Sequence, residues 1–406
     1  MYYKSRYAYV GCLVRRCSPQ QKEQEQKTGL KSCAVVLLFV IMLWCLPLAT
    51  TQATEHDATD VPTRVAFINP GYGDRGFWKD VRDTMQAASD QFGYELIVFD
   101  SNRDSKMMIE SAQKVFALEP APDYIIAVNE HQQGTRIVLE AEERGIPVIM
   151  LLNDLTKEQK NAYGYPGRDF EHWIFSLTPD NERAGYDIAK SLIDNARLQG
   201  ENRQPAPLCL LSIAGDSKTP ASLQRLQGLD HALSRFPLLS EQRRLVANWS
   251  YDEAYRQTEN WLRRGGCVDA VWAANDDIAL GALAALQKAG RKPGKDVFVG
   301  GLNWSPAGLR NVADGKMTMT HGGHFFAGAW VMVLLHDYIH GVEFLSHHPE
   351  ISFRMEAITR ENISHFVDVL GSRDWNSLDF KDFSIANSPV GAEYNFVLHP
   401  GDGLRE

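Results

Sequence analysis

The chain has 406 residues, of which 44% are hydrophobic and 23% charged, a composition typical of a globular protein with room for two domains. Its net charge of −9 argues against a nucleic-acid partner, because neutralising phosphates requires clustered Lys and Arg.

The N-terminal region has the pattern of a signal peptide. Residues 34–46 (AVVLLFVIMLWCL) form an unbroken apolar run of 13 residues, and Thr51 and Ala53 are small residues at positions −3 and −1 of a cleavage site. Such a run rises only about 20 Å as a helix, whereas a hydrocarbon core is roughly 30 Å thick. We therefore predict a signal peptide and N-terminal extension over residues 1–53, cleaved after Ala53, with export to the periplasm. The alternative is an uncleaved membrane anchor.

From residue 64 onward, short apolar runs alternate with amphipathic helical patterns. Predicted strands span residues 64–69, 94–100, 123–129 and 146–151 in a first series, and residues 207–215, 243–249, 268–275 and 296–303 in a second. The runs are continuous rather than alternating, and helical patterns separate them, which predicts parallel sheets covered on both faces. We expect an α/β fold with two doubly wound lobes.

The two series match in register, which indicates an internal duplication. PDYIIAVNE and VDAVWAAND each end in Asn and a carboxylate, so Asn129 corresponds to Asn275. In the same way Asn153 corresponds to Asn303. Ligands of parallel α/β sheets bind beyond the carboxyl ends of the strands. The four Asn side chains are thus predicted to hold a ligand between the lobes, with helix capping as the alternative role for the first pair.

Three further strands are predicted to cross between the lobes, near residues 174–177, 316–320 and 352–358. They divide the chain into an N-terminal lobe of residues 62–173 plus 320–351 and a C-terminal lobe of residues 174–319 plus 352–406, which includes a C-terminal extension. Shared segments of this kind suit a hinge.

The motif GYGDRG (71–76) follows a strand and opens a helix, and Asp100 ends the next strand. Formally this is a dinucleotide fingerprint, and an exported NAD-dependent dehydrogenase is one alternative function. However, Phe77 and Trp78 follow at once, where the fingerprint needs small residues, and Pro70 interrupts the strand. We favour a loop that closes over a ligand with Phe77 and Trp78 as an aromatic lid, since aromatic faces suit sugar rings.

The chain resembles the type I periplasmic binding proteins, in particular the ribose and galactose group of sugar-transport receptors. The resemblance covers roughly residues 62–365 and is carried by AANDDIALGALAALQKAG, LTPDNERAGYDIAK and GFWKDVRDTMQAASDQFGYELIVFDS. It implies a monomeric binding protein, not an enzyme, that takes no cofactor and delivers a small sugar-like ligand to the permease of an ABC importer. The alternative partner is a membrane kinase, cyclase or chemoreceptor, as for a sensory receptor of the autoinducer-2 type.

The resemblance also implies which residues contact the ligand. Phe77 and Trp78 match the stacking aromatics of the family, and Asn129 and Asn275 match a hydrogen-bonding Asn in each lobe. The complete predicted set is Phe77, Trp78, Asn129, Asn153, Trp249, Asn275, Asn303 and His324.

This chain departs from the family where charged residues would clamp sugar hydroxyls. Leu152 and Asn153 replace an adjacent Asp and Arg, and the fifth loop has no Arg before Arg225. Charged clamps are among the stronger contacts, so their loss predicts a neutral site lined by Asn and Trp, which suits a modified sugar. The carboxylates Glu130, Asp276 and Asp277 are interpreted as helix caps rather than catalytic groups.

Neither metal binding nor metal-dependent chemistry is predicted, because the spacing of His131, His321 and His324 is not that of a chelate. Only Cys209 and Cys267 remain after removal of the predicted leader. They lie near the amino ends of the first and third strands of the second series, which are neighbours in a doubly wound sheet. An oxidising compartment permits a disulfide, and a buried, unpaired Cys209 is the alternative.

Overall fold

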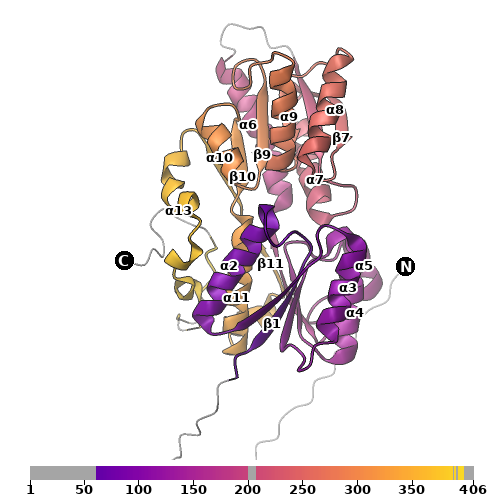
Figure 1. The fold of residues 1–406 in the computed structure, drawn as a ribbon, viewed down its shortest axis with the longest axis vertical. Coiled ribbons are helices and arrows are strands. Elements are labelled where there is room, and N and C mark those ends of the chain that lie inside the picture. Colours follow the sequence, from indigo (N-terminus) through magenta and orange to yellow (C-terminus); the bar gives the residue numbers. More distant parts are fainter. Residues whose placement is uncertain (1–60, 200–206, 387, 390–391, 397–406) are drawn as a thin grey trace, which may run out of the picture. The chain divides into compact units, whose positions relative to one another are not determined.

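The computed structural model describes residues 61–199, 207–386, 388–389 and 392–396. The predicted signal peptide and its cleavage site at Ala53 lie outside these residues. The described chain contains two six-stranded sheets, with strand orders β11-β5-β4-β3-β1-β2 and β12-β10-β9-β8-β6-β7 (Figure 1). We call each sheet with its helices a lobe.

In the first lobe all strand pairs are parallel. The strands are β1 (Arg64–Asn69), β2 (Glu95–Asp100), β3 (Tyr124–Ala127), β4 (Val148–Leu151), β5 (Trp173–Pro179) and β11 (Glu350–Phe353). The helices that lie between these strands in the sequence or directly precede β11 are α2 (Gly76–Phe92), α3 (Ser105–Phe116), α4 (Gly134–Arg144), α5 (Lys157–Tyr163), α11 (Ala327–Ile339) and α12 (Phe344–His347).

The second lobe repeats this arrangement, except that its last strand is antiparallel to its neighbour. Its strands are β6 (Leu208–Ala214), β7 (Leu239–Val246), β8 (Ala270–Ala273), β9 (Phe298–Leu302), β10 (Met319–Gly322) and β12 (Glu356–Thr359). Its helices are α6 (Asn181–Gln199), α7 (Pro220–Arg235), α8 (Tyr251–Arg263), α9 (Asp276–Lys288) and α10 (Pro306–Ala313).

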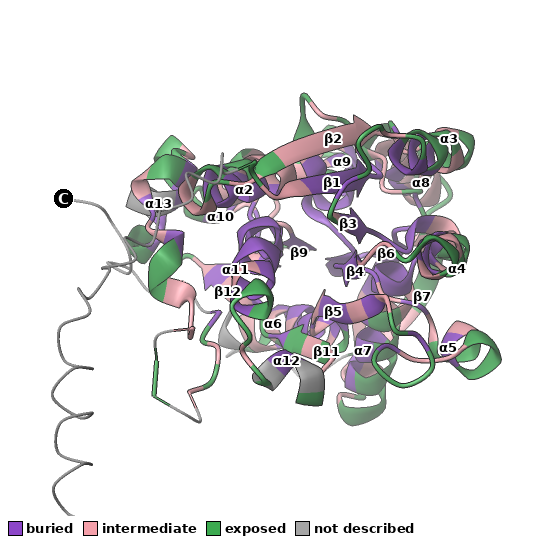
Figure 2. Cartoon of the chain, turned by 90° about the horizontal axis from the view of Figure 1, so that it is seen from below, coloured by how far each residue is buried: buried purple, intermediate pink, exposed green. Residues whose placement is uncertain are grey.

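The observed topology confirms the predicted fold class. In both lobes the first five strands have the order 2-1-3-4-5, which is that of a doubly wound sheet. The central strands β3, β4, β8 and β9 are almost entirely buried, as their continuous apolar sequences predict. Helix α11 is also apolar on nearly every side and is buried against α2 (Figure 2).

The structure contains the disulfide that the sequence permitted but did not decide. Cys209 and Cys267 are bonded, with their Cα atoms 5.7 Å apart. Strands β6 and β8 pair in parallel with Leu210 opposite Ala270, which brings the two Cys residues together at the amino ends of these strands. Among the described residues, the one cluster of three potential metal ligands consists of these two Cys residues and Asp269, and the bond occupies both sulfurs.

Several predicted boundaries are wrong, among them those of one strand and of two crossovers. At the predicted crossover near residues 316–320, strand β10 pairs with β9 and β12 inside the second lobe. Strand β7 begins at Leu239 rather than at residue 243, because an edge strand that is half exposed accepts the polar sequence SEQRR. The predicted crossover near residues 174–177 is part of β5, which pairs with β4 and β11 inside the first lobe. The chain therefore enters the second lobe only after Pro179, at the start of α6.

The later part of the C-terminal extension, from Trp375 onward, packs on the first lobe, not on the second as predicted. Gln91 of α2 donates to the carbonyl oxygen of Leu378 at 2.8 Å and accepts from the backbone nitrogen of Phe380 at 2.9 Å. Asp337 of α11 accepts from the hydroxyl group of Tyr394 at 2.9 Å. The sequence alone could not show which surface these segments cover.

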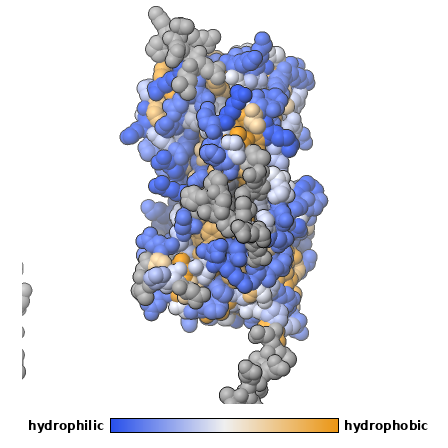
Figure 3. Space-filling model, turned by 90° about the vertical axis from the view of Figure 1, so that its left-hand side faces the viewer, coloured by the Kyte–Doolittle hydropathy of each residue, from blue (hydrophilic) through white to orange (hydrophobic). Residues whose placement is uncertain are grey.

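On the face that Figure 3 shows, hydrophilic side chains predominate and hydrophobic ones form small separate groups. Within the described part of the chain, no helix combines the length and apolar character needed to cross a membrane.

Candidate functional site

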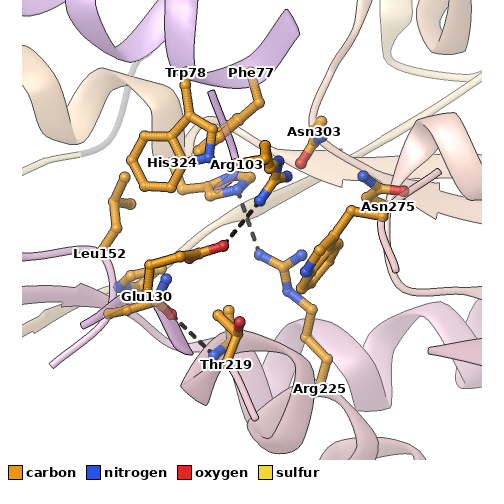
Figure 4. A pocket seen from close by; sticks show the side chains of 14 residues that line it. Phe77, Trp78, Arg103, Glu130, Leu152, Thr219, Arg225, Asn275, Asn303 and His324 are labelled. Carbon is orange, nitrogen blue, oxygen red and sulfur yellow. Dashed lines mark hydrogen bonds and ion pairs between the residues drawn. The ribbon is translucent and has the colours of Figure 1, made fainter. Parts of the chain in front are cut away.

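A cavity with about 450 Å³ of empty space, part of it open to solvent, lies at the carboxyl ends of strands from both lobes (Figure 4). This is the position at which parallel α/β sheets bind their ligands. The residues that line it are Phe77, Trp78, Arg103, Glu130, Leu152, Asn153, Pro179, Thr219, Ala221, Arg225, Trp249, Asn275, Asn303 and His324.

Seven of the eight predicted ligand-contact residues line this cavity, and Asn129 is the exception. The Asn129 side chain is fully buried beside the cavity wall. Its Nδ2 donates to the Asp154 carbonyl oxygen at 2.9 Å and to Gln159 Oε1 at 2.7 Å, and its Oδ1 accepts from the Gly134 nitrogen at 2.8 Å. These bonds hold the loops after β3 and β4 together, so we assign Asn129 a structural role.

The next residue, Glu130, reaches the cavity instead. Its Oε1 forms an ion pair with Arg103 Nη1 at 3.0 Å, and its side chain is only 4% exposed. Burial raises the pKa of Glu130, and the nearby guanidinium of Arg103 opposes that rise. The interpretation of Glu130 as a helix cap is therefore wrong: it gives the cavity a paired carboxylate.

Arg225 of α7 brings a second guanidinium into the cavity (Figure 4). Its Nε donates to Asn181 Oδ1 at 2.9 Å, its Nη1 donates to the Ala274 carbonyl oxygen at 2.9 Å, and its Nη2 lies 3.4 Å from His324 Nε2. Burial lowers the pKa of Arg225 to about 9, which still leaves it charged at neutral pH.

The prediction of a neutral site is thus wrong. Arg103, Glu130 and Arg225 all line the cavity although none was among the predicted contacts. Each comes from an element other than the loop in which the family resemblance placed its charged clamp. The one signal in the sequence was the position of Glu130 directly after a strand, since that end of the strand faces the ligand.

Aromatic rings form two walls of the cavity. Phe77 stacks on His324 with ring centroids 4.4 Å apart, and it meets Trp78 edge-on at 5.2 Å. On the opposite lobe, the Trp249 ring lies 5.8 Å from the Arg103 guanidinium and 5.7 Å from that of Arg225. The cavity is therefore lined by both flat aromatic faces and charged groups.

The glycines of GYGDRG make room for these walls. A Cβ atom on Gly71 would lie 2.2 Å from the Cβ atom of Trp78, and one on Gly73 would lie 2.0 Å from Asp100 Oδ2. Asp100 in turn accepts a hydrogen bond from Asn69 Nδ2 at 2.7 Å. In this structure the motif allows Trp78 to pack against the turn.

Two of the predicted Asn residues have a second role. Asn275 Oδ1 accepts from the Ile278 nitrogen at 2.9 Å, which makes Asn275 the N-cap of α9 as well as a cavity residue. Asn153 Oδ1 accepts from the Ala221 nitrogen at 2.9 Å, and this bond joins the two lobes. Asp276 does not cap its own helix; its carboxylate accepts from Ser305 and Thr320 and ties α9 to β10.

Several cavity residues have a strained backbone. Arg103, Leu152, Trp249 and Asn303 have φ values of 62°, 63°, 59° and 145°, respectively. Non-glycine residues rarely adopt such angles, which cost on the order of 1–3 kcal/mol each and cluster at functional sites. All four lie just after the carboxyl end of a strand, and the unusual φ angle at each residue directs its side chain toward the cavity.

A family model described as periplasmic binding protein domain matches residues 65–341. The chain belongs to the periplasmic binding protein family.

Relatives of this binding protein include ribose import binding proteins. That of Haemophilus influenzae is 27% identical over 249 residues, which cover 61% of this chain and 75% of the relative. That of Escherichia coli is 28% identical over 274 residues, covering 67% and 81%. A solved structure of a periplasmic sugar-binding protein from Pseudomonas fluorescens superimposes with a TM-score of 0.74 and 31% identity, covering 82% of this chain and 98% of that one. These homologues are binding proteins rather than enzymes, which leaves the dehydrogenase interpretation without support.

Inside the cavity of this binding protein, His324 is expected to make stability depend on pH. Burial, and to a lesser extent the charges of Arg225 and His321, lower the pKa of His324 well below 6.5. Below pH 6.5 the unfolded chain takes up a proton at this residue and the folded protein does not, so stability falls as the pH falls. Between pH 7 and pH 5 the loss from His324 is about 2 kcal/mol.

Urea unfolding at the two pH values tests this expectation. The stability difference between pH 7 and pH 5 should be smaller by about 2 kcal/mol in His324→Gln than in the wild type. The control is His365→Gln, which alters an exposed histidine. Equal pH dependence in His324→Gln and wild type would show that His324 titrates normally in the folded protein.

Proposed function

We propose that this protein captures a small carbohydrate between its two lobes and delivers it to an ABC importer. The observation that carries the proposal is the composition of the cavity wall, which combines aromatic rings with charged and amide groups from both lobes. A sugar ring matches such a wall because its C–H faces are apolar and its rim carries hydroxyl groups.

The charged residues suit hydroxyl recognition in particular. The guanidinium of Arg225 can donate to a hydroxyl oxygen, and the carboxylate of Glu130 can accept from a hydroxyl hydrogen. Charge-assisted hydrogen bonds of this kind are about twice as strong as neutral ones. Arg103, Glu130 and Arg225 thus take the place of the Asp and Arg clamp that the sequence lacks at Leu152 and Asn153.

The known relatives favour a ligand with a single ring or a short polyol chain. The relatives include ribose import binding proteins, a xylitol-binding protein of Mycolicibacterium smegmatis and a D-apiose import binding protein of Actinobacillus succinogenes. We therefore propose a pentose, a pentitol or a compound of similar size.

A ligand in this cavity would stabilise the closed arrangement of the lobes, because it would contact residues of both. Direct bonds already join the lobes here: Asn153 to Ala221, and Gln132 Nε2 to the Lys218 carbonyl oxygen at 3.3 Å. A ligand shifts a conformational equilibrium only by its difference in affinity for the two states. Contacts from both sides of the cavity provide that difference, and the import partner would recognise the closed form.

Mass spectrometry of the small molecules released from the purified, denatured protein tests the ligand class. Titration calorimetry with D-ribose, xylitol, D-apiose and a sugar phosphate should then show that the neutral pentose-sized compounds bind. Exclusive binding of an amino acid or of a phosphorylated compound would contradict the proposal. Stimulation of an importer's ATPase activity by the liganded protein would test delivery separately.

Asn275 offers a test of ligand contact that separates binding from helix capping. Asn275→Ser keeps a side-chain oxygen for the Ile278 nitrogen but removes the amide group, so it should weaken ligand binding by about 1–3 kcal/mol with little change in ligand-free stability. Asn275→Ala should lose the same affinity and also about 1 kcal/mol of stability. Calorimetry and thermal unfolding of both variants measure the two effects. Full affinity in the Ser variant would leave Asn275 with the capping role alone.

A further inference from the structure

The chain returns from the second lobe to the first after β12. The returning segment comprises η3 (Ile363–His365), α13 (Val367–Ser372), η4 (Trp375–Ser377) and η5 (Phe380–Phe383). In Figure 1 it runs beside α10 of the second lobe and beside α2 of the first. None of its residues lines the cavity.

One side chain of this segment, Arg373, contacts both lobes. Its Nη2 donates to the carbonyl oxygen of Trp304 at 2.7 Å, and Trp304 follows the cavity residue Asn303 in the second lobe. Its Nη1 lies 2.6 Å from an oxygen of Asp80, which belongs to α2, two residues beyond Trp78. The Arg373 and Asp80 side chains are 17% and 19% exposed, so water screens this ion pair less than one at the surface.

The loop that Arg373 holds is strained. Trp304 has a φ of 53° and is only 2% exposed, and its ring packs on Phe366, with centroids 5.2 Å apart. A Cβ atom on Gly322 would lie 2.6 Å from this ring, so strand β10 also fits closely against it. Strained backbone persists only where its surroundings determine it. Phe366 and Arg373, both from the returning segment, are part of those surroundings.

We infer that Arg373 is a positioning residue that restrains the separation of the lobes and orients the loop carrying Asn303. It acts through Asp80 on one side and Trp304 on the other, without touching the ligand. Removing it should let the lobes sample wider separations in the ligand-free protein. The inference does not depend on which solute the cavity binds, so it can fail or hold independently of the proposed carbohydrate.

Electron–electron resonance distances between spin labels test the inference on the ligand-free protein without residues 1–53, whose four Cys residues would also take up labels. Leu139 of α4 and Tyr251 of α8 are each 43% exposed and belong to different lobes. In Figures 1 and 2 these helices lie on the side of the molecule away from α13. An opening of the lobes that is hinged near α13 would therefore move the two labels furthest apart. The labelled pair is Leu139→Cys with Tyr251→Cys, and the bonded Cys209 and Cys267 remain in place.

Arg373→Ala is expected to move the distance distribution to longer values and to broaden it. Asp80→Asn, which removes the charge from α2 and leaves Arg373 in place, should shift it in the same direction by less. The matched control is Arg360→Ala, which removes an exposed arginine just after β12 and should leave the distribution unchanged. An unchanged distribution in both Arg373→Ala and Asp80→Asn, with native circular dichroism, would overturn the inference even if the melting temperature fell. Should Arg373→Ala fail to fold, Asp80→Asn and Arg373→Lys decide the question by the same readout.

Discussion

Replacing Cys209 and Cys267 by Ala should lower the free energy of unfolding by about 4 kcal/mol. The two residues are 58 positions apart, and in the chain-entropy model a bridge that closes a loop of this length restricts the unfolded chain by about that amount. Packing should contribute little to the loss, because Cys209 is only partly buried and Cys267 is exposed. Urea unfolding followed by circular dichroism, with the slope checked for two-state behaviour, measures the change.

Ligand affinity should stay the same in this double variant, because the bridge lies at the amino ends of the strands and the cavity at the carboxyl ends. Thiol titration of the denatured, unreduced protein is the control, and it should find no free thiol at Cys209 or Cys267. Two free thiols, or a stability loss below about 1 kcal/mol, would show that the bond does not support the fold in solution.

Arg225→Met should weaken ligand binding by about 3 kcal/mol, roughly 150-fold, because truncating one partner of a buried charged hydrogen bond typically costs 2–5 kcal/mol. Arg225→Lys should give an intermediate loss, since an ammonium group keeps the charge but not the planar fork of donors. Calorimetry with the ligand identified by mass spectrometry measures both. Arg235→Met, at an exposed position near the end of the same helix, is the matched control.

Arg225 also supports the second lobe, so stability must be measured beside affinity. The Met variant leaves Asn181 Oδ1 and the Ala274 carbonyl oxygen without their donors, and a buried unpaired group costs about 1–3 kcal/mol. Thermal unfolding without ligand gives this structural loss separately. A stability loss with unchanged affinity would assign Arg225 to the structure of the lobe rather than to the ligand.

The sequence determined the fold class and the general position of the site. Continuous apolar runs separated by helical patterns specify buried parallel strands, whatever the details of packing. The internal match between the two series placed Asn153, Asn275 and Asn303 at equivalent strand ends, and the structure brings all three to one cavity. The same spacing argument placed Cys209 and Cys267 on neighbouring strands, which is where they are bonded.

Tertiary structure alone decided which polar groups face the cavity. Asn129 and Glu130 are adjacent in the chain, yet their side chains have different surroundings. The Asn129 side chain makes three hydrogen bonds within the first lobe, whereas the Glu130 side chain lines the cavity. The direction of a side chain after a strand depends on the φ angles of its loop, and periodicity does not report them. Arg103 and Arg225 reach the cavity on long side chains from elements that carry no matching motif. The later part of the C-terminal extension packs on α2 and α11 for a similar reason: only the assembled surfaces decide where it packs.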